Sequence, residues 1–394
     1  MKKKILFVME SLGIGGAEKS LVTLLSQLDY SQYEVDLFLF HPCGEFMELI
    51  PKEVKVIDVP IDFEYFILNP IKALKYLFLN KKFKLLYFKL AELFILTINR
   101  SILHKEYIGW NYINKSVETI HKEYDIAIGF LEKKSIYFTI DKVKASKKIG
   151  WIHTDYSKIQ YNYKLDNKYL GRLDNIVAVS EHCKEVLTDI FPEYKEKIIV
   201  IKNIISPAII NKMAEEKVEE IKLDKDEVLI CTVARLTPAK GIDVAIECCR
   251  RITKRGIKLK WIVIGDGEER NNLQKIINSY SLENIFILLG AKSNPYKYMK
   301  ISDIYVQSSR WEGFGITVSE AKILNKPILV NNIPEFKQQI NEGFGVVYNT
   351  IDDMEEKLVE LIINSENRKY LCNNLYQINQ TRNKEINNLN KIFF

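Results

Sequence analysis

The chain has 394 residues, of which 47% are hydrophobic and 27% charged, and its formal net charge is +6. The length predicts two or three globular domains, and the absence of any apolar run near ~20 residues excludes a spanning helix. The six cysteines show no CxxC spacing, which argues against a disulfide framework or a zinc site and favours buried thiols in a reducing compartment.

Buried-strand patterns alternate with helical patterns along the whole chain. The first apolar run, 5–9, favours a strand over a signal peptide, because Glu10 and the following glycines cut it short. Helical stretches such as 17–27, 243–254 and 268–278 separate most of the strands. The expected strands are 5–9, 35–40, 54–59, 126–130, 148–152, 176–179 and 198–201 in the first half, and 228–233, 260–264, 285–288, 304–307, 327–330 and 346–348 in the second.

This alternation predicts an α/β protein with two Rossmann-like, doubly wound parallel-sheet domains that face each other across a cleft. We expect an N-terminal acceptor-side domain over 1–205 and a C-terminal donor domain over 206–371. The C-terminal helix, about 372–394, is expected to pack back near the first domain. Ligands in such folds bind beyond the carboxyl ends of the strands.

A basic segment follows the third expected strand. Between residues 71 and 105 the chain carries eight Lys or Arg residues and one acid, Glu92, interleaved with Leu, Ile, Phe and Tyr. The pattern resembles a basic amphipathic surface helix or helix pair, and it predicts docking on an anionic membrane surface. A helix pair that packs its apolar face on the domain is the alternative. The basic residues are Lys72, Lys75, Lys81, Lys82, Lys84, Lys89, Arg100 and Lys105.

The stretch from Ser309 to Glu320 is the most informative motif. Glu312 is expected on a loop after the strand 304–307, and Glu320 in the helix that follows. Glycines in the loop let the backbone approach a ligand, and a helix start offers free N–H groups to phosphate. Carboxylates accept hydrogen bonds from sugar hydroxyls. The segment therefore suits a nucleotide-sugar.

Two further candidate loops follow the first expected strand of each half of the chain. Gly15 and Gly16 open a helix after the strand 5–9, although their spacing is not the dinucleotide pattern and a tight turn explains them equally well. Arg235 and Lys240 stand five apart after the strand 228–233, where Arg can hold phosphate with two donors and Lys can add a point charge. A solvated loop is the alternative for this pair of cations.

Together these motifs resemble the retaining, nucleotide-sugar-dependent glycosyltransferases of family 4, which have the GT-B fold. The resemblance rests on Gly15-Gly16, Arg235 with Lys240-Gly241, and Glu312-x7-Glu320, and it covers nearly the whole chain. Weaker matches occur at 200–203, 265–267, 289–296 and 327–335. The chain departs from the family pattern at Lys202, which replaces a proline, and at 331–334, where the loop is short and lacks glycines.

The resemblance implies a role for each motif. Arg235 and Lys240 would hold the diphosphate and stabilise the leaving group, with Gly15 and Gly16 closing on it from the other domain. Glu320 would bind the ribose and Glu312 the donor sugar, so Glu312, Arg235, Lys240 and His153 form the expected catalytic set. The remaining expected donor contacts are Gly290, Phe314, Gly315, Ile316 and Thr317.

Outside these motifs, His153 and Asp155 follow the strand 148–152. Family members similarly place a His beside the donor sugar, and Asp155 is a candidate for binding acceptor hydroxyls, although a lone His is more often structural. No metal and no cofactor is expected. The only Asp-x-Asp triplet, 224–226, lies ahead of a strand in a charged turn, and cations with helix-start amides can stabilise the phosphates instead.

We therefore expect a cytoplasmic enzyme, peripheral on the inner face of the plasma membrane, that binds no nucleic acid. It would move a hexose from a nucleoside-diphosphate sugar, with UDP expected from family frequency, to a glycan or lipid-linked saccharide in bacterial surface polysaccharide synthesis. The alternatives are a GT-B sugar-nucleotide epimerase, whose motifs differ from Glu-x7-Glu, and a non-catalytic glycan-binding subunit, which would be favoured by loss of Arg235, Lys240 or Glu320.

Overall fold

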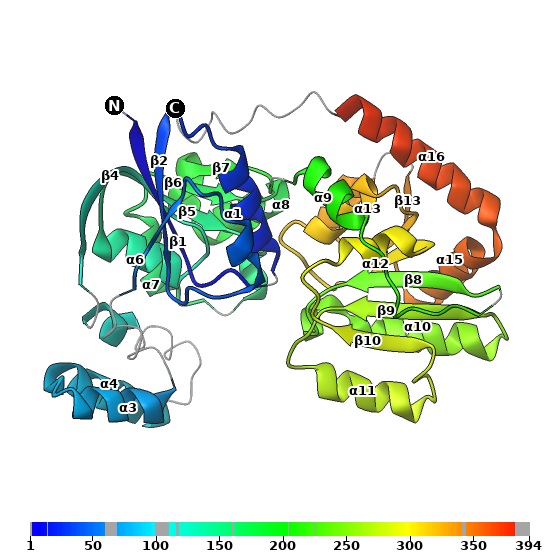
Figure 1. The fold of residues 1–394 in the computed structure, drawn as a ribbon, viewed down its shortest axis with the longest axis horizontal. Coiled ribbons are helices and arrows are strands. Elements are labelled where there is room, and N and C mark those ends of the chain that lie inside the picture. The colour runs from blue at the N-terminus through cyan, green and yellow to red at the C-terminus, as the bar shows by residue number, and fades with distance from the viewer. Residues whose placement is uncertain are drawn as a thin grey trace. The chain divides into compact units, whose positions relative to one another are not determined.

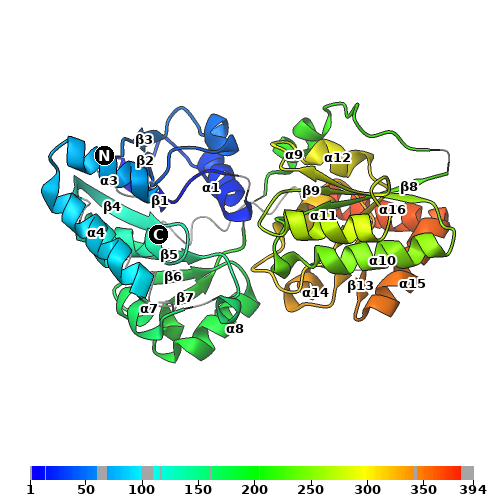
Figure 2. The same cartoon turned by 90° about the horizontal axis from the view of Figure 1, so that it is seen from below.

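The structure, a computed structural model, divides the chain into two compact units, Met1–Asn203 and Ile204–Phe394. The division falls two residues before the expected boundary at 205. Figures 1 and 2 show the two units from two directions. The structure describes residues 2–13, 15–59, 69–98, 110–115, 118–159, 161–203, 205–224, 226–340 and 344–382.

The first unit is built on a seven-stranded parallel sheet in the order β3-β2-β1-β4-β5-β6-β7. Its strands are β1 (Lys3–Met9), β2 (Tyr33–Leu39), β3 (Lys55–Ile57), β4 (Ile120–Gly129), β5 (Val143–Ile152), β6 (Asn175–Ala178) and β7 (Ile198–Val200). Its α-helices are α1 (Gly16–Gln27), α3 (Pro70–Leu79), α4 (Phe83–Ile98), α6 (Lys134–Lys142), α7 (Tyr163–Leu170) and α8 (Glu181–Ile190). The 3-10 helices are η1 (Glu45–Leu49), η2 (Tyr156–Lys158) and η3 (Pro192–Lys197).

All seven strands expected in this half are present, but β4 and β5 begin earlier than predicted. Their first halves pair with each other and mix buried or half-buried with exposed side chains, with Lys144 exposed and Lys147 half-buried. A parallel strand that is covered on both faces has a continuous apolar pattern, and these two halves lack it. The pattern therefore indicated only the buried halves, which lie next to the carboxyl ends of the strands.

The second unit has a six-stranded parallel sheet in the order β10-β9-β8-β11-β12-β13. All six expected strands occur, as β8 (Val228–Val233), β9 (Leu259–Ile264), β10 (Phe286–Gly290), β11 (Ile304–Gln307), β12 (Ile328–Asn331) and β13 (Gly345–Tyr348). The helices are α9 (Pro207–Ala214), η4 (Pro238–Lys240), α10 (Ile242–Lys254), α11 (Arg270–Ser279), α12 (Tyr296–Ile301), α13 (Ile316–Ile323), α14 (Pro334–Ile340), α15 (Ile351–Ile363) and α16 (Ser365–Arg382).

Alternate residues of β8 enter different cores, because successive side chains of a strand point to opposite faces. Ile230 packs with residues of α10, α11 and α15, whereas Leu229 and Cys231 pack with residues of α9, α12, α13 and α14. Figure 1 shows α10 and α11 on one side of this sheet and α12 on the other. Both faces of the sheet are therefore covered, and loops at the carboxyl ends of the strands remain available for a ligand.

Helix α16 differs from expectation. The predicted domain end at residue 371 falls inside this helix, which packs on α13 and α15 of the second unit. Asn379 fixes the contact by donating to the carbonyl of Lys322 at 2.8 Å and to Oδ1 of Asn325 at 2.7 Å. Residues 372–382 thus belong to the second unit, and the rest of the predicted C-terminal helix lies outside the described residues.

The cysteines are free thiols. Cys183, Cys231, Cys248 and Cys249 are buried as expected, whereas Cys43 is exposed and Cys372 is half-buried. Burial raises the pKa of the Cys249 thiol to about 12, so this group stays protonated at neutral pH.

Candidate active site

The loops after the neighbouring strands β8 and β11 bring the predicted cations and carboxylate together in the second unit. Lys240 ends η4, and its Nζ atom lies 2.5 Å from Oε2 of Glu312 in an ion pair whose side chains are 17% and 11% exposed. Arg235 lies on the same loop as Lys240 and is exposed, with no ion pair to any residue that the structure describes. The arrangement places the cation predicted to bind phosphate beside the carboxylate predicted to bind sugar hydroxyls, with a second cation at the surface.

A series of hydrogen bonds between buried polar side chains, which starts on β11, fixes the Glu312 carboxylate. The Tyr305 hydroxyl donates to Oε1 of Gln307 at 2.7 Å, and Nε2 of Gln307 donates to Oγ of Ser309 at 3.0 Å. Ser309 in turn donates to Oε1 of Glu312 at 2.6 Å. Each of these groups has a defined partner, so the carboxylate is held in one orientation before any ligand arrives. The sequence analysis missed Tyr305 and Gln307. These polar residues lie two apart on β11, and Ser309 continues the same spacing just after the strand, which is the pattern that could have revealed them.

The Phe314–Thr317 segment turns into helix α13 at Gly315. Its φ of 77° is left-handed, and a Cβ at this position would lie 2.5 Å from the ring of Phe336, so only glycine fits. Gln339 on α14 donates from Nε2 to the carbonyl of Phe314 and accepts from the Ser319 hydroxyl at 2.6 Å. The first backbone N–H groups of α13, from Ile316 onward, are thereby held at the carboxyl end of β11.

Glu320 lies on α13, as predicted, and is fully buried. Its Oε1 accepts a hydrogen bond of 3.0 Å from the hydroxyl of Tyr296, the first residue of α12. Burial, together with the Glu320 charge, raises the pKa of the Tyr296 hydroxyl well above its usual value, so this hydroxyl remains a donor. Tyr296, which the sequence analysis included only in the weaker match at 289–296, therefore orients the carboxylate assigned to the ribose.

Gly290, predicted to contact the donor, ends β10 beside the turn after β9. The Gly265 N–H donates to the Gly290 carbonyl at 2.9 Å, and Arg270 donates from Nη2 to the Leu288 carbonyl at 3.1 Å. Gly290 itself has a φ of 78°. The two turns are thus joined by a backbone hydrogen bond at the carboxyl ends of β9 and β10, next to the β8 loop that carries Arg235.

In the first unit, helix α1 begins at Gly16, and Gly15 ends the loop that follows β1. Gly15 precedes the helix with extended backbone and no side-chain cap, so backbone N–H groups of the first turn face outward from the helix start. The segment around Gly44 is hydrogen-bonded to this loop. The Leu12 backbone N–H donates to the Cys43 carbonyl at 3.0 Å, and the Phe46 N–H donates to the Leu12 carbonyl at 3.0 Å. This support was not evident from the sequence.

His153 follows β5 at the same edge of the sheet. Its ring packs on Phe130, with centroids 5.0 Å apart, and lies nearly parallel to Trp151. Burial lowers the pKa of His153 to about 3, with a small opposing effect from the Phe130 backbone, so the imidazole is neutral at physiological pH. The carboxylate of Glu132, which follows β4, accepts the His153 backbone N–H at 3.1 Å. Glu132 is a residue of this edge that the sequence analysis missed.

Asp155 is buried and already engaged. Its Oδ1 accepts the Ser157 N–H at 3.0 Å and the Ser157 hydroxyl at 2.7 Å, which starts the short helix η2. Its Oδ2 lies 3.4 Å from Nε2 of His182. These contacts give Asp155 a structural role as an N-cap. Acceptor binding by Asp155 stays a prediction.

Family comparison agrees with this fold. The family model for group 1 glycosyl transferases matches residues 213–378, and the model for Glycosyltransferase Family 4 matches residues 14–208. The chain belongs to the family 4 glycosyltransferases with the GT-B fold.

Curated relatives match over shorter stretches. An uncharacterized glycosyltransferase of Methanocaldococcus jannaschii is 34% identical over 177 residues, which are 44% of this chain and 43% of the relative. The poly(ribitol-phosphate) α-N-acetylglucosaminyltransferase of Staphylococcus aureus is 24% identical over 233 residues, or 56% of this chain and 45% of the relative. The chain thus spans about half the length of these relatives.

Solved structures match over nearly the whole chain. HepE of Anabaena, in complex with UDP and glucose, has a TM-score of 0.65 at 16% identity, covering 96% of this chain and 95% of that one. S. aureus TarM, in complex with fondaparinux, α-GlcNAc-glycerol and UDP, has a TM-score of 0.62 at 17% identity, covering 95% and 96%. At these identities the likeness shows the shared fold.

Proposed function

We propose that the protein is a retaining glycosyltransferase that moves a hexose from a nucleoside-diphosphate sugar, with UDP as nucleotide, to a glycan or lipid-linked saccharide. The observation that carries the proposal is the contact of Lys240 with Glu312 beside the exposed Arg235. The HepE and TarM structures contain UDP, which supports UDP as the nucleotide. The S. aureus relative is a poly(ribitol-phosphate) α-N-acetylglucosaminyltransferase and an Escherichia coli relative is an O-antigen biosynthesis glycosyltransferase, which supports bacterial surface polysaccharide synthesis.

In the proposed reaction the bond between the sugar anomeric carbon and the diphosphate oxygen breaks, and a bond to the acceptor oxygen forms on the same face. The leaving phosphate takes the acceptor's proton, so no protein base is needed. Arg235, Lys240 and the α13 start stabilise the charge that develops on the diphosphate, without a metal ion. Glu312 and the neutral His153 contact the sugar, and Glu320 holds the ribose, so the protein acts mainly by positioning.

We also propose that the helix pair α3–α4 docks on the anionic inner face of the plasma membrane. Its outer side chains are large and apolar, and each exposes half or more of its surface: Ile71, Phe78, Leu79, Phe83, Tyr87, Leu90 and Phe94. Exposed lysines accompany them, namely Lys72, Lys75, Lys81, Lys82 and Lys84. The segment's one acid, Glu92, turns inward to a buried ion pair of 2.7 Å with Lys89. The outer face is thus basic and apolar, as interfacial binding requires.

This arrangement weakens the alternative in which the apolar residues pack on the domain and only the lysines meet solvent. Ala73 and Leu77 are buried, so the pair does have an inner face, but Phe78, Phe83, Tyr87 and Phe94 are exposed. Arg100 and Lys105, which the sequence analysis counted with this segment, lie outside the described residues. In the part of the chain that the structure describes, no helix combines the length and apolarity that crossing a membrane requires.

Calorimetric titration with UDP, GDP and ADP tests the nucleotide, and a screen of UDP-sugars with and without saccharide acceptors tests the reaction. The proposal predicts micromolar-range binding of UDP and release of UDP that depends on the acceptor. Release of nucleotide at the same rate without any acceptor would favour an epimerase or a hydrolase. Binding of glycans without nucleotide would favour a non-catalytic subunit.

A further inference from the structure

Arg310 joins the two loops that form the diphosphate site of the proposed function. It lies two residues before Glu312, and its guanidinium makes a two-pronged ion pair with Asp243, from Nη1 to Oδ1 at 2.9 Å and from Nη2 to Oδ2 at 2.6 Å. Nη1 also donates to the Pro238 carbonyl at 2.7 Å, and the Arg310 backbone N–H donates to the Ala239 carbonyl at 2.8 Å. One residue of the β11 loop thus contacts the β8 loop just before Lys240 and the first turn of α10 just after it.

The backbones of the two loops are in direct contact on the other side of Lys240. The Ser308 hydroxyl donates to the Lys240 carbonyl at 3.1 Å. Gly241 has a φ of 61°, and a Cβ at this position would lie 2.2 Å from the Ser308 carbonyl oxygen. Lys240 is therefore bracketed, with Arg310 contacting residues 238, 239 and 243 and Ser308 contacting residues 240 and 241.

An arginine side chain is well suited to fix the position of the loop that carries Lys240. A guanidinium that forms two parallel hydrogen bonds to a carboxylate fixes direction as well as distance, which an ammonium does not. Burial by itself would raise the pKa of Asp243, but the hydrogen bonds and the charge of Arg310 outweigh it and hold that pKa below its usual value. The pair is partly exposed, with side chains 39% and 45% accessible, so it contributes little to global stability.

We propose that the Arg310–Asp243 pair is a clamp that positions Lys240 for the donor diphosphate. Arg310 and Asp243 are positioning residues, since they act through Lys240. The inference rests on the proposed function, because it needs a diphosphate that Lys240 binds. Without the Arg310 side chain, Lys240 retains its ion pair with Glu312, but the hydrogen bonds from Arg310 to the Pro238 carbonyl and to the Asp243 carboxylate are lost.

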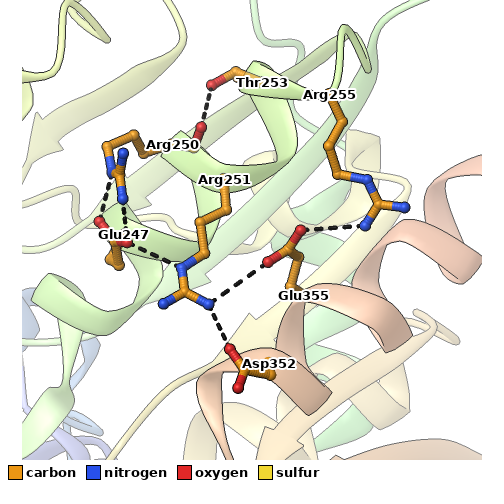
Figure 3. A network of polar contacts seen from close by, with 7 residues as sticks. All are labelled: Glu247, Arg250, Arg251, Thr253, Arg255, Asp352 and Glu355. Atoms are coloured by element: carbon orange, nitrogen blue, oxygen red, sulfur yellow. Dashed lines mark hydrogen bonds and ion pairs between the residues drawn. The ribbon is translucent and has the colours of Figure 1, made fainter.

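The same helix offers a matched control at its other end. Arg251 of α10 donates from Nη1 to Oδ1 of Asp352 at 2.6 Å and from Nε to Oε1 of Glu247 at 3.0 Å. Figure 3 shows this network, which also includes Arg250, Arg255 and Glu355 and links α10 to α15. Arg251 is partly exposed and paired with two carboxylates, as a close match to Arg310, but it lies near the end of α10, two turns from Asp243. Its loss removes a comparable ion pair without touching the Lys240 loop.

The experiment measures calorimetric affinities for a nucleoside diphosphate, the tightest of UDP, GDP and ADP, and for its monophosphate. The variants are Arg310→Ala, Arg310→Lys, Lys240→Ala, the double variant Arg310→Ala/Lys240→Ala, and Arg251→Ala as control. We expect Arg310→Ala to weaken diphosphate binding about tenfold, a usual size of coupling between neighbouring residues, and monophosphate binding less than twofold. Arg310→Lys should lie between Arg310→Ala and the parent, and Arg251→Ala should match the parent.

The double-mutant cycle separates a clamp from general support. Once Lys240 is gone there is nothing left to position, so adding Arg310→Ala to Lys240→Ala should cost less than a further twofold. Equal weakening of monophosphate and diphosphate, full additivity in the cycle, or no loss in Arg310→Ala would each overturn the clamp. If the parent binds no nucleoside diphosphate, or Lys240→Ala binds as tightly as the parent, the proposed function itself fails, and the clamp fails with it.

Discussion

The ammonium of Lys240 lies 2.5 Å from Oε2 of Glu312, although 72 positions separate the two residues in the chain. The family resemblance assigns them separate tasks, one on the diphosphate and one on the sugar. In the folded chain each is the counter-ion of the other. Removing one partner of a largely buried pair leaves the other charge without compensation, so single variants at these positions report on both residues.

Replacing the cations should slow the reaction strongly. We expect Lys240→Ala and Arg235→Ala each to lower kcat by roughly two orders of magnitude or more, as for loss of a charge stabiliser at a leaving group. Steady-state kinetics with saturating donor and acceptor measures the effect, with circular dichroism as a check on folding. Lys240→Ala/Glu312→Gln should bind free UDP more tightly than Lys240→Ala, since it removes the uncompensated carboxylate. Near-parent kcat in both single variants would reject the diphosphate assignment.

The two glutamates should differ in what they bind. Glu320→Ala should weaken binding of free UDP, because the ribose loses hydrogen bonds to a charged group that are each worth about 1.5–3 kcal/mol. Glu312→Ala should impair use of the donor sugar without weakening UDP binding, because it leaves the Lys240 charge available to the diphosphate. Tyr296→Phe removes the hydroxyl that holds Oε1 of Glu320, so we expect a smaller loss of UDP affinity in the same direction. Calorimetry with UDP and a UDP-sugar measures all three, and equal UDP losses in Glu312→Ala and Glu320→Ala would contradict this division.

His153 should make the fold sensitive to acid. Its pKa is about 3 in the folded chain and about 6.5 in an unfolded one, so the unfolded state binds the extra proton as pH falls below about 6.5. Stability from this residue is present above that pH and is progressively lost between about 6.5 and 3. At pH 5 the loss amounts to about 2 kcal/mol.

Urea unfolding at pH 7.5 and pH 5 measures this difference. His153→Gln, which cannot take up the proton, should lose less stability between the two values than the parent does. His121→Gln serves as the control, since His121 lies on β4 away from the carboxyl edge of the sheet. An identical pH dependence in the parent and His153→Gln would mean that His153 titrates normally in the folded chain.

Activity should survive chelation. The proposed charge stabilisers are Arg235, Lys240 and backbone N–H groups. Asp224 and Asp226 lie before β8, at the opposite end of that strand from Arg235. Assays after dialysis against EDTA should therefore retain parent turnover. Complete inactivation that Mg²⁺ or Mn²⁺ reverses would falsify the metal-free mechanism.

Membrane docking through α3–α4 should depend on both charge and apolar surface. Each Lys near an anionic surface contributes about 1 kcal/mol, and the attraction fades over a Debye length of about 10 Å at 0.1 M salt. We expect co-sedimentation with vesicles that contain phosphatidylserine, less binding as salt rises, and loss of binding in Lys81→Glu/Lys82→Glu/Lys84→Glu. Tyr87→Ser/Leu90→Ser/Phe94→Ser should also weaken binding, but without changing its salt dependence.

A charge-matched control distinguishes a local surface from overall net charge. Lys195→Glu/Lys254→Glu/Lys258→Glu changes the net charge by the same amount at exposed positions outside the helix pair. This variant should bind vesicles nearly as well as the parent. If both triple glutamate variants bind the vesicles equally well, docking through α3–α4 is wrong. It is also wrong if the parent does not bind anionic vesicles at low salt.

The sequence by itself determined the strand content, the parallel topology and the residues of the motif loops. Each strand of both sheets was predicted at least in part, because the part of a parallel strand that is covered on both faces is apolar, which is a local pattern. Glu312 on a loop and Glu320 in the next helix followed from glycine placement and helical periodicity, which are also local.

Only the tertiary structure decided which side chains hold those motifs in place. Arg310 reaches Asp243 across 67 positions, Tyr296 reaches Glu320 across 24, and Glu132 reaches the His153 backbone across 21. The start of β4 and the packing of α16 were likewise invisible to local pattern. Such partners are chosen by the pairing order of strands, since β11 lies beside β8 and β4 beside β5, and no local periodicity carries that order.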